Sequence, residues 1–136
     1  MFGDQAVLER RGRTAMSRAS LSRPMALAIE DGLISSETTV FDYGCGRGGD
    51  IARLSDQGIS AAGWDPAHRP EVPLTTAHVV NLGFVVNVIE DPVARRIALE
   101  SAWSLAERLL VVAARLDWDL ATTGACHGDG VLTAKG

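Results

Sequence analysis

The chain has 136 residues, 46% of them hydrophobic and 22% charged, with a formal net charge of -4. This composition is ordinary for one globular domain and excludes a disordered chain, while the negative charge excludes a domain that attracts nucleic acid by its overall field. No apolar run approaches the roughly 20 residues that cross a membrane, and residues 1–15 lack a secretory signal's apolar segment. The sequence therefore predicts a cytoplasmic protein that does not contact a membrane.

The two cysteines, Cys45 and Cys126, are too few for a disulfide framework and do not have the spacing of zinc ligands. Cys126 is followed directly by His127, but two further ligands at zinc-finger spacing are missing from the sequence. The sequence therefore predicts reduced thiols and no metal site.

Residues 1–21 are predicted to form a basic, loosely held arm with a short helix around 15–19. The stretch 9–23 has Glu9 as its one acid against five arginines, Arg10, Arg11, Arg13, Arg18 and Arg23. Guanidinium groups bind phosphates through charge-assisted hydrogen bonds, so these arginines are candidate DNA contacts. The alternative that stays open is a solvated face or a lid over a bound ligand.

Residues 22–116 carry the elements of the predicted domain. A helix begins after Ser22, which has the residue type of an N-cap, and ends at Gly32. The β-branched and aromatic run 38–41 predicts a buried strand. That strand breaks into a tight, glycine-rich turn, after which a second helix ends at Gly58. A strand, a glycine turn and a helix thus form the centre of the predicted fold.

The glycine turn predicts a ligand site. Four glycines fall within six residues, at Gly44, Gly46, Gly48 and Gly49. Glycine lets the backbone approach a ligand closely, and the following helix directs unpaired N–H groups toward it, so a nucleotide-like ligand is expected. The pattern G-x-G-x-x-G is shared by NAD, FAD and S-adenosylmethionine sites and does not separate them.

Two acids narrow the ligand class. Asp42 lies two residues before Gly44, where a carboxylate would repel a dinucleotide's pyrophosphate and attract the amino group of a methionine moiety. Asp65 ends the apolar run 59–64, roughly 20 residues past the turn, the offset at which an acid accepts hydrogen bonds from ribose hydroxyls. Both acids end predicted strands, and together they favour S-adenosylmethionine over NAD.

Residues 68–76 are predicted to be irregular because prolines interrupt this region, with at most a short strand over 72–74. The next clear strand is 78–83. Its carboxyl end, where open α/β sheets bind ligands, contains Asn81, Leu82 and Gly83. Asn81 is a candidate substrate-facing residue, and the alternative is that it only caps a turn.

Asp91 and Pro92 predict the cap and the first residue of a long helix. The apolar run 109–113 predicts a buried parallel strand. Four strands that alternate with helices predict an α/β fold, a Rossmann-like, doubly wound parallel sheet. Residues 117–136 are rich in loop signals and contain no strand that would close such a sheet, so we interpret the domain as truncated before its last strands.

Several motifs resemble known methyltransferases. Residues 41–48, Phe-Asp-Tyr-Gly-Cys-Gly-Arg-Gly, resemble the first motif of class I S-adenosylmethionine-dependent methyltransferases, and Gly-Trp-Asp-Pro at 63–66 resembles the acidic end of their second strand. With the blocks 13–18, 21–24 and 81–92, these motifs resemble the methyltransferase family associated with DNA phosphorothioation, in which sulfur is placed in the DNA backbone. The resemblance covers most of the chain, from Arg13 onward.

The resemblance implies S-adenosylmethionine as the cofactor. Its methionine part would be received by backbone amides of the turn, at Gly44, Cys45, Gly46 and Gly48. Asp42 would hold the ammonium group, and Asp65 would hold the ribose hydroxyls. The residues that would face the sulfonium are Asn81, Leu82 and Gly83.

Two alignments of the segment 81–92 remain open. One sets residues 81–84 against the Asn-Pro-Pro-aromatic motif of amino-group methyltransferases, although both prolines are missing. The other sets residues 85–92 against the Val-Leu-His-His-Leu-x-Asp-Pro run of small-molecule methyltransferases, and its length favours it. No general base is identifiable, and Asn81 is the candidate catalytic residue.

The sequence thus predicts the cofactor-binding part of an S-adenosylmethionine-dependent methyltransferase associated with DNA phosphorothioate modification. Such chemistry depends largely on positioning the acceptor, because the sulfonium is already a reactive methyl donor. The alternative is a non-catalytic S-adenosylmethionine-binding or DNA-associated module of a DNA modification system, with the arginine-rich arm on DNA. An NAD-dependent oxidoreductase is a third hypothesis, which Asp42 disfavours.

Overall fold

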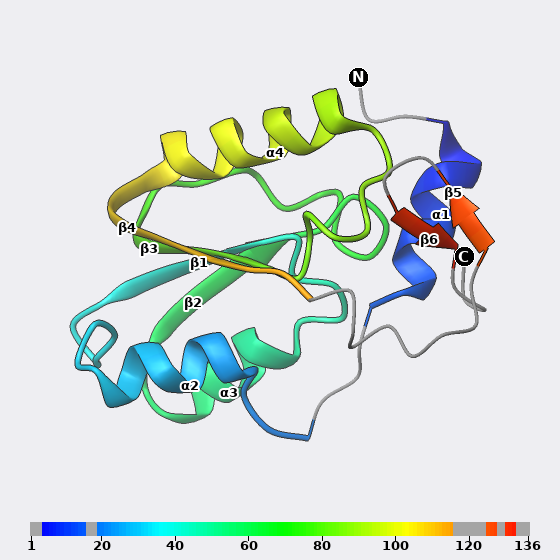
Figure 1. Cartoon of the computed structure of the whole chain (residues 1–136). Coiled ribbons are helices and arrows are strands. Elements are labelled where there is room, and N and C mark those ends of the chain that lie inside the picture. The colour runs from blue at the N-terminus through cyan, green and yellow to red at the C-terminus, as the bar shows by residue number, and fades with distance from the viewer. Residues whose placement is uncertain (1–3, 16–18, 116–124, 128–129, 133–136) are drawn as a thin grey trace.

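The computed structural model describes residues 4–15, 19–115, 125–127 and 130–132, and it is an α/β structure around one parallel sheet (Figure 1). The sheet has four strands in the order β2-β1-β3-β4, all parallel. The strands are β1 Thr39–Tyr43, β2 Ser60–Trp64, β3 Ala77–Gly83 and β4 Ala106–Ala113. The α/β class and the parallel sheet predicted from the sequence are confirmed.

Helices cover both faces of the sheet (Figure 1). On one face, α2 Arg23–Glu30 and α3 Gly49–Asp56 enclose a core that contains Met25, Val40, Leu54 and Val79. On the other face, α4 Pro92–Leu105 encloses a core that contains Phe41, Tyr43, Val80, Leu82 and Ala102. Because side chains alternate along β1 and β3, consecutive residues of each strand enter opposite cores. This arrangement is compatible with a Rossmann-like fold.

The predicted helix signals act as expected at α4 but not at α2. The carboxylate of Asp91 accepts hydrogen bonds from the backbone N–H groups of Val93 and Ala94, each at 3.2 Å, which caps α4. Ser22 occupies the N-cap position of α2, yet its side chain makes no capping hydrogen bond. Instead its backbone N–H and its hydroxyl donate to the carboxylate of Asp50, at 2.7 and 2.6 Å. Ser22 therefore ties the start of α2 to the start of α3.

The strand β4 lies at an edge of the sheet and pairs only with β3 among the described strands. The prediction of a buried strand over 109–113 is therefore wrong in its burial. The side chain of Val112 is 46% exposed, and Leu109 and Leu110 are half-buried. A continuous apolar run does not reveal whether a neighbour covers the second edge of a strand, because that depends on sheet order.

Each end of the chain contains elements that the sequence did not predict. The N-terminal arm contains the helix α1 Gln5–Arg13; residues 15 and 19 lie outside any helix, and residues 16–18 of the helix expected at 15–19 lie outside the described residues. No residue of α1 is buried. Within the segment 117–136, β5 Ala125–His127 and β6 Gly130–Leu132 form an antiparallel pair separate from the four-stranded sheet, and the other residues of this segment lie outside the described residues.

The short strand considered over 72–74 is absent, and residues 71–76 are irregular, as their prolines favour. None of the helices in the described part of the chain combines the length and the apolar character that a membrane crossing requires.

Candidate functional site

The glycine turn that follows β1 is held by hydrogen bonds within the chain. The backbone N–H groups of Gly44 and Cys45 donate to the carbonyl of Trp64 at 2.8 and 3.0 Å, and that of Gly48 donates to the carbonyl of Cys45 at 2.9 Å. The N–H of Gly46 donates to the carboxylate of Asp65 at 2.9 Å. The four amides expected to receive a methionine moiety are thus already engaged within the chain.

Asp65 joins the glycine turn to the loop after β2. One carboxylate oxygen accepts from the N–H of Gly46, and the other accepts from the N–H groups of Ala67 and His68, at 2.9 and 3.0 Å. A carboxylate offers about four lone-pair sites, so one site is left for a further donor. The role of Asp65 on ribose hydroxyls stays a prediction, and its observed role is to fix the geometry of two loops.

Three glycines of the turn have positive φ angles, at Gly44 (φ 83), Gly46 (φ 54) and Gly48 (φ 80). A Cβ atom on each would meet the chain itself. It would lie 2.4 Å from Val85 Cγ2 at the first, 3.1 Å from Ala15 Cβ at the second and 2.4 Å from Arg69 Nη2 at the third. The space beside these three glycines is therefore occupied by the chain's own side chains.

Asp42 and Asn81 form a buried polar pair at the carboxyl ends of β1 and β3. They are register partners on the two neighbouring strands, and Asn81 Nδ2 donates to Asp42 Oδ1 at 3.0 Å. Both residues are buried, with 5% and 2% of their surface exposed. The other amide atom, Asn81 Oδ1, is buried and has no hydrogen-bond partner among the described residues. The pair therefore holds an acceptor that is not satisfied.

Burial raises the pKa of Asp42 from 3.8 to about 7, and the negative charge of Asp50 adds to this rise, while the hydrogen bond from Asn81 opposes it. Near neutral pH this carboxyl group is therefore only partly ionised. A positive charge placed beside it would favour the carboxylate form and lower its pKa again.

Cys45 lies half-buried in the turn with a protonated thiol. Burial raises the pKa of Cys45 to about 12, and the nearby negative charges of Asp42 and Asp65 add to the rise. The Sγ–H group donates to the carbonyl of Gly46 at 3.7 Å. A raised pKa keeps this thiol protonated at neutral pH, which makes it a poor nucleophile.

The segment after Asn81 contains a strained residue. Phe84 has φ 60, the one non-glycine residue of the described chain with a positive φ angle, and its N–H donates to the carbonyl of Ala113 at 2.7 Å. Strain of this kind clusters at functional sites. The side chain of Leu82 is fully buried in the core below α4, so only its backbone could face a ligand, whereas Gly83 is partly exposed at the strand end.

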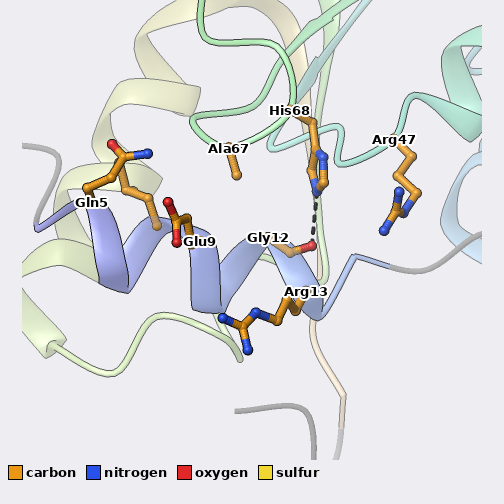
Figure 2. A pocket seen from close by; sticks show the side chains of 8 residues that line it. Gln5, Glu9, Gly12, Arg13, Arg47, Ala67 and His68 are labelled. Atoms are coloured by element: carbon orange, nitrogen blue, oxygen red, sulfur yellow. Dashed lines mark hydrogen bonds between the residues drawn. The ribbon is translucent and has the colours of Figure 1, made fainter.

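The helix α1 lies beyond the carboxyl ends of the strands and borders a hollow of about 320 Å³ (Figures 1 and 2). His68 Nε2 lies 2.9 Å from the carbonyl oxygen of Gly12, which fastens the helix to the loop after β2. Arg13 of the helix and Arg47 of the glycine turn both line the hollow. The hollow therefore adjoins the turn and has two guanidinium groups on its wall.

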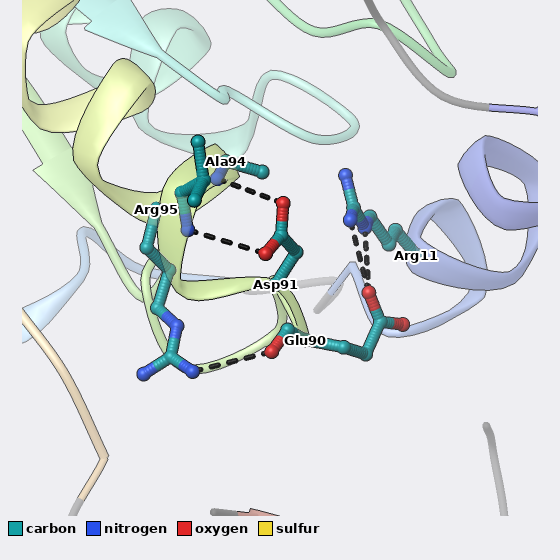
Figure 3. Close-up of polar contacts among 6 residues, drawn as sticks. Arg11, Glu90, Asp91, Ala94 and Arg95 are labelled. Atoms are coloured by element: carbon teal, nitrogen blue, oxygen red, sulfur yellow. Dashed lines mark hydrogen bonds and ion pairs between the residues drawn. The ribbon is translucent and has the colours of Figure 1, made fainter. Parts of the chain in front are cut away.

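The arginines proposed as DNA contacts are not equivalent. Arg11 is paired with Glu90 through two hydrogen bonds to one carboxylate oxygen, at 2.9 and 3.2 Å (Figure 3). Arg23 lies 3.8 Å from Glu30. Arg10 and Arg13 are exposed on α1, and Arg18 lies outside the described residues. Arg11 thus anchors α1 to the segment before α4, which leaves two exposed arginines on the helix.

Within the described residues, no group of three or more His, Cys, Asp or Glu side chains is placed to hold a metal ion. Comparison of the sequence with protein-family models finds no match, and no curated protein matches it either.

Arg69 is the residue of this site that the sequence did not reveal. Its guanidinium lies against Gly48 although it follows β2 and is far from the turn along the chain. The available signal was the Asp65-Pro66 turn, which reverses the chain and returns residue 69 toward β1. How sharply the chain reverses there depends on contacts between distant residues, which no local motif encodes.

Proposed function

We propose that this chain is the cofactor-binding part of a class I S-adenosylmethionine-dependent methyltransferase. The observation that carries the proposal is the meeting of Asp42, Asn81 and Asp65 around one glycine turn, at the carboxyl ends of three adjacent parallel strands. Open α/β sheets bind ligands at this edge, where the strand order reverses. Here the reversal lies at β1, since the chain passes from β2 on one side to β3 on the other.

The polar atoms fit the amino end of a methionine moiety. Asn81 Oδ1 is a buried acceptor without a partner among the described residues, and the neighbouring Asp42 becomes a carboxylate when a cation approaches. An ammonium group has three donors and one positive charge, so it can satisfy the amide oxygen and the carboxylate together. A pyrophosphate could satisfy neither the amide oxygen nor the carboxylate, because it has no hydrogen-bond donor and is itself negatively charged. This pairing of an unsatisfied acceptor with a carboxyl group favours a cationic ligand.

When bound, S-adenosylmethionine supplies an electrophilic methyl group, and the chain's task is to bind and orient it. Asp42 and Asn81 would hold the amino end, and the remaining acceptor site of Asp65 would receive a ribose hydroxyl. Val85 and Ala15 cover the turn and would shift outward on binding. Displacement of Ala15 would move the segment that follows α1.

Isothermal titration with S-adenosylmethionine and with NADH tests the proposal. We expect S-adenosylmethionine to bind, to bind more tightly at pH 8 than at pH 6, and to release a proton at pH 6 to 7. The reason is that the bound cation converts Asp42 to its charged form. Proton release is read from titrations in two buffers with different ionisation enthalpies. Binding of NADH without a response to S-adenosylmethionine would refute the assignment.

A second candidate function is a DNA-associated module of a DNA modification system, without catalysis of its own. The observation that favours it is that Arg10 and Arg13 are exposed on α1 and that Arg47 shares the hollow with Arg13. Phosphate contacts give an affinity that falls steeply as salt rises. A filter-binding titration of duplex DNA at several salt concentrations separates the two candidates. The DNA-associated module requires an affinity for DNA that falls as salt rises, and the methyltransferase proposal does not.

A further inference from the structure

The loop after β2 has a defined conformation that places Arg69. The backbone N–H of Arg69 donates to the carbonyl of Asp65 at 2.9 Å, and the two residues form an isolated antiparallel bridge. Inside this reversal, the Asp65 carboxylate accepts from the N–H groups of Ala67 and His68. Because the Asp65 carboxylate also accepts from the N–H of Gly46, it fixes the position of this loop relative to the glycine turn.

The guanidinium of Arg69 lies against the turn. A Cβ atom on Gly48 would be 2.4, 2.9 and 3.1 Å from Nη2, Cζ and Nε of Arg69, so the guanidinium packs directly against this glycine. Gly48 is also the N-cap of α3, the positive end of that helix dipole. A ligand anion at this position would be attracted both by the guanidinium and by the helix end, and in the described part of the chain Arg69 makes no ion pair.

The surrounding charges have the pattern of a zwitterion. The Cys45 thiol, at the centre of the turn, is within electrostatic reach of Asp42, Asp65 and Arg69. The site therefore places two carboxyl groups and one guanidinium around a single turn. The backbone amides of Gly44, Cys45, Gly46 and Gly48 are already bonded. They are not available to a ligand anion, whereas the guanidinium is.

We propose that Arg69 binds the carboxylate of the ligand's amino-acid end and makes the site select ligands that carry one. The inference rests on the proposed function, because it takes S-adenosylmethionine as the ligand. A guanidinium binds a carboxylate through two parallel, charge-assisted hydrogen bonds. Asp42 and Asn81 then hold the ammonium of the same α-amino acid group, so that both of its charges are met by side chains.

The test compares two ligands and three variants by isothermal titration. The ligands are S-adenosylmethionine and its decarboxylated analogue, which keeps the sulfonium, the amine and the nucleoside. Wild-type chain is expected to prefer S-adenosylmethionine by roughly 10- to 100-fold, the range that a hydrogen-bonded charge pair provides. Arg69→Gln should lose that preference and bind both ligands alike, and Arg69→Lys should retain part of it.

The matched control is Arg108→Gln, which removes one positive charge near the amino-terminal end of β4, the end opposite to the site. Because charges more than a Debye length away are screened, this variant should bind both ligands with affinities within about twofold of wild type. If wild type binds S-adenosylmethionine but does not prefer it to the analogue, or if Arg69→Gln keeps the preference, the role of Arg69 is refuted and the methyltransferase proposal stands. If wild type binds neither ligand, both fall. The wild-type preference needs no variant, so the test holds even if Arg69→Gln does not fold.

Discussion

Replacing Asp42 with asparagine tests the central electrostatic feature of the site. In the folded chain the pKa of Asp42 is raised from 3.8 to about 7, chiefly by burial. Folding below pH 3.8 therefore involves a neutral group, whereas folding above pH 7 requires a buried carboxylate. The stabilising contribution is present below pH 3.8 and is lost as the pH rises through about 7. In the Asp42→Asn variant the side chain at this position is uncharged at every pH, so the variant does not lose this stability as the pH rises.

The magnitude follows from the pKa difference. Each pKa unit corresponds to roughly 1.4 kcal/mol, so the change from 3.8 to about 7 is worth about 4 kcal/mol, to order of magnitude. The side chain introduced by Asp42→Asn can still accept from Asn81 Nδ2, and its own amide adds a donor beside the unpartnered Asn81 Oδ1. We therefore expect the variant to be more stable than wild type at pH 8, by a margin that shrinks toward pH 4.

Urea unfolding between pH 4 and pH 9 measures this margin, with the fluorescence of the buried Trp64 as the signal. Asp56→Asn is the matched control, because it makes the same change of residue type at an exposed position, the end of α3. Parallel pH profiles for wild type and Asp42→Asn would show that Asp42 is not a buried acid with a raised pKa. The reasoning about the ligand's charge would then lose its basis.

Two further changes test the frame that holds the site. Ser22→Ala removes the buried hydroxyl that donates to Asp50 at 2.6 Å, and urea unfolding should show a loss of about 1.5–3 kcal/mol; a loss below about 0.5 kcal/mol would contradict the tie between α2 and α3. Gly44→Ala and Gly58→Ala both place alanine at a positive φ angle, which costs about 1–2 kcal/mol. Only the former brings a Cβ within 2.4 Å of Val85, so it should cost about 1–3 kcal/mol more. Equal losses in the two alanine variants would mean that Val85 does not cover the turn.

The sequence by itself determined the order and type of the central elements. The β-branched run before Gly44, the four closely spaced glycines and the helix signals of Asp91 and Pro92 are local features, and local features act over a few residues. From them follow β1, the turn, α3 and α4 as the structure has them. The rule that parallel strands end at one edge then places Asp42, Asp65 and Asn81 together without any knowledge of contacts.

Only the tertiary structure decided how these residues are used. Whether Asp65 is open to a ribose or bonded to Gly46 depends on how sharply the loop after β2 reverses, and the same reversal sets Arg69 on Gly48. The burial that raises the pKa of Asp42 comes from the register of β1 with β3 and from helices packed above it. Such contacts join residues that are 19 and 39 positions apart along the chain. Their free energy depends on loop closure and sheet register, which no short pattern of residues encodes.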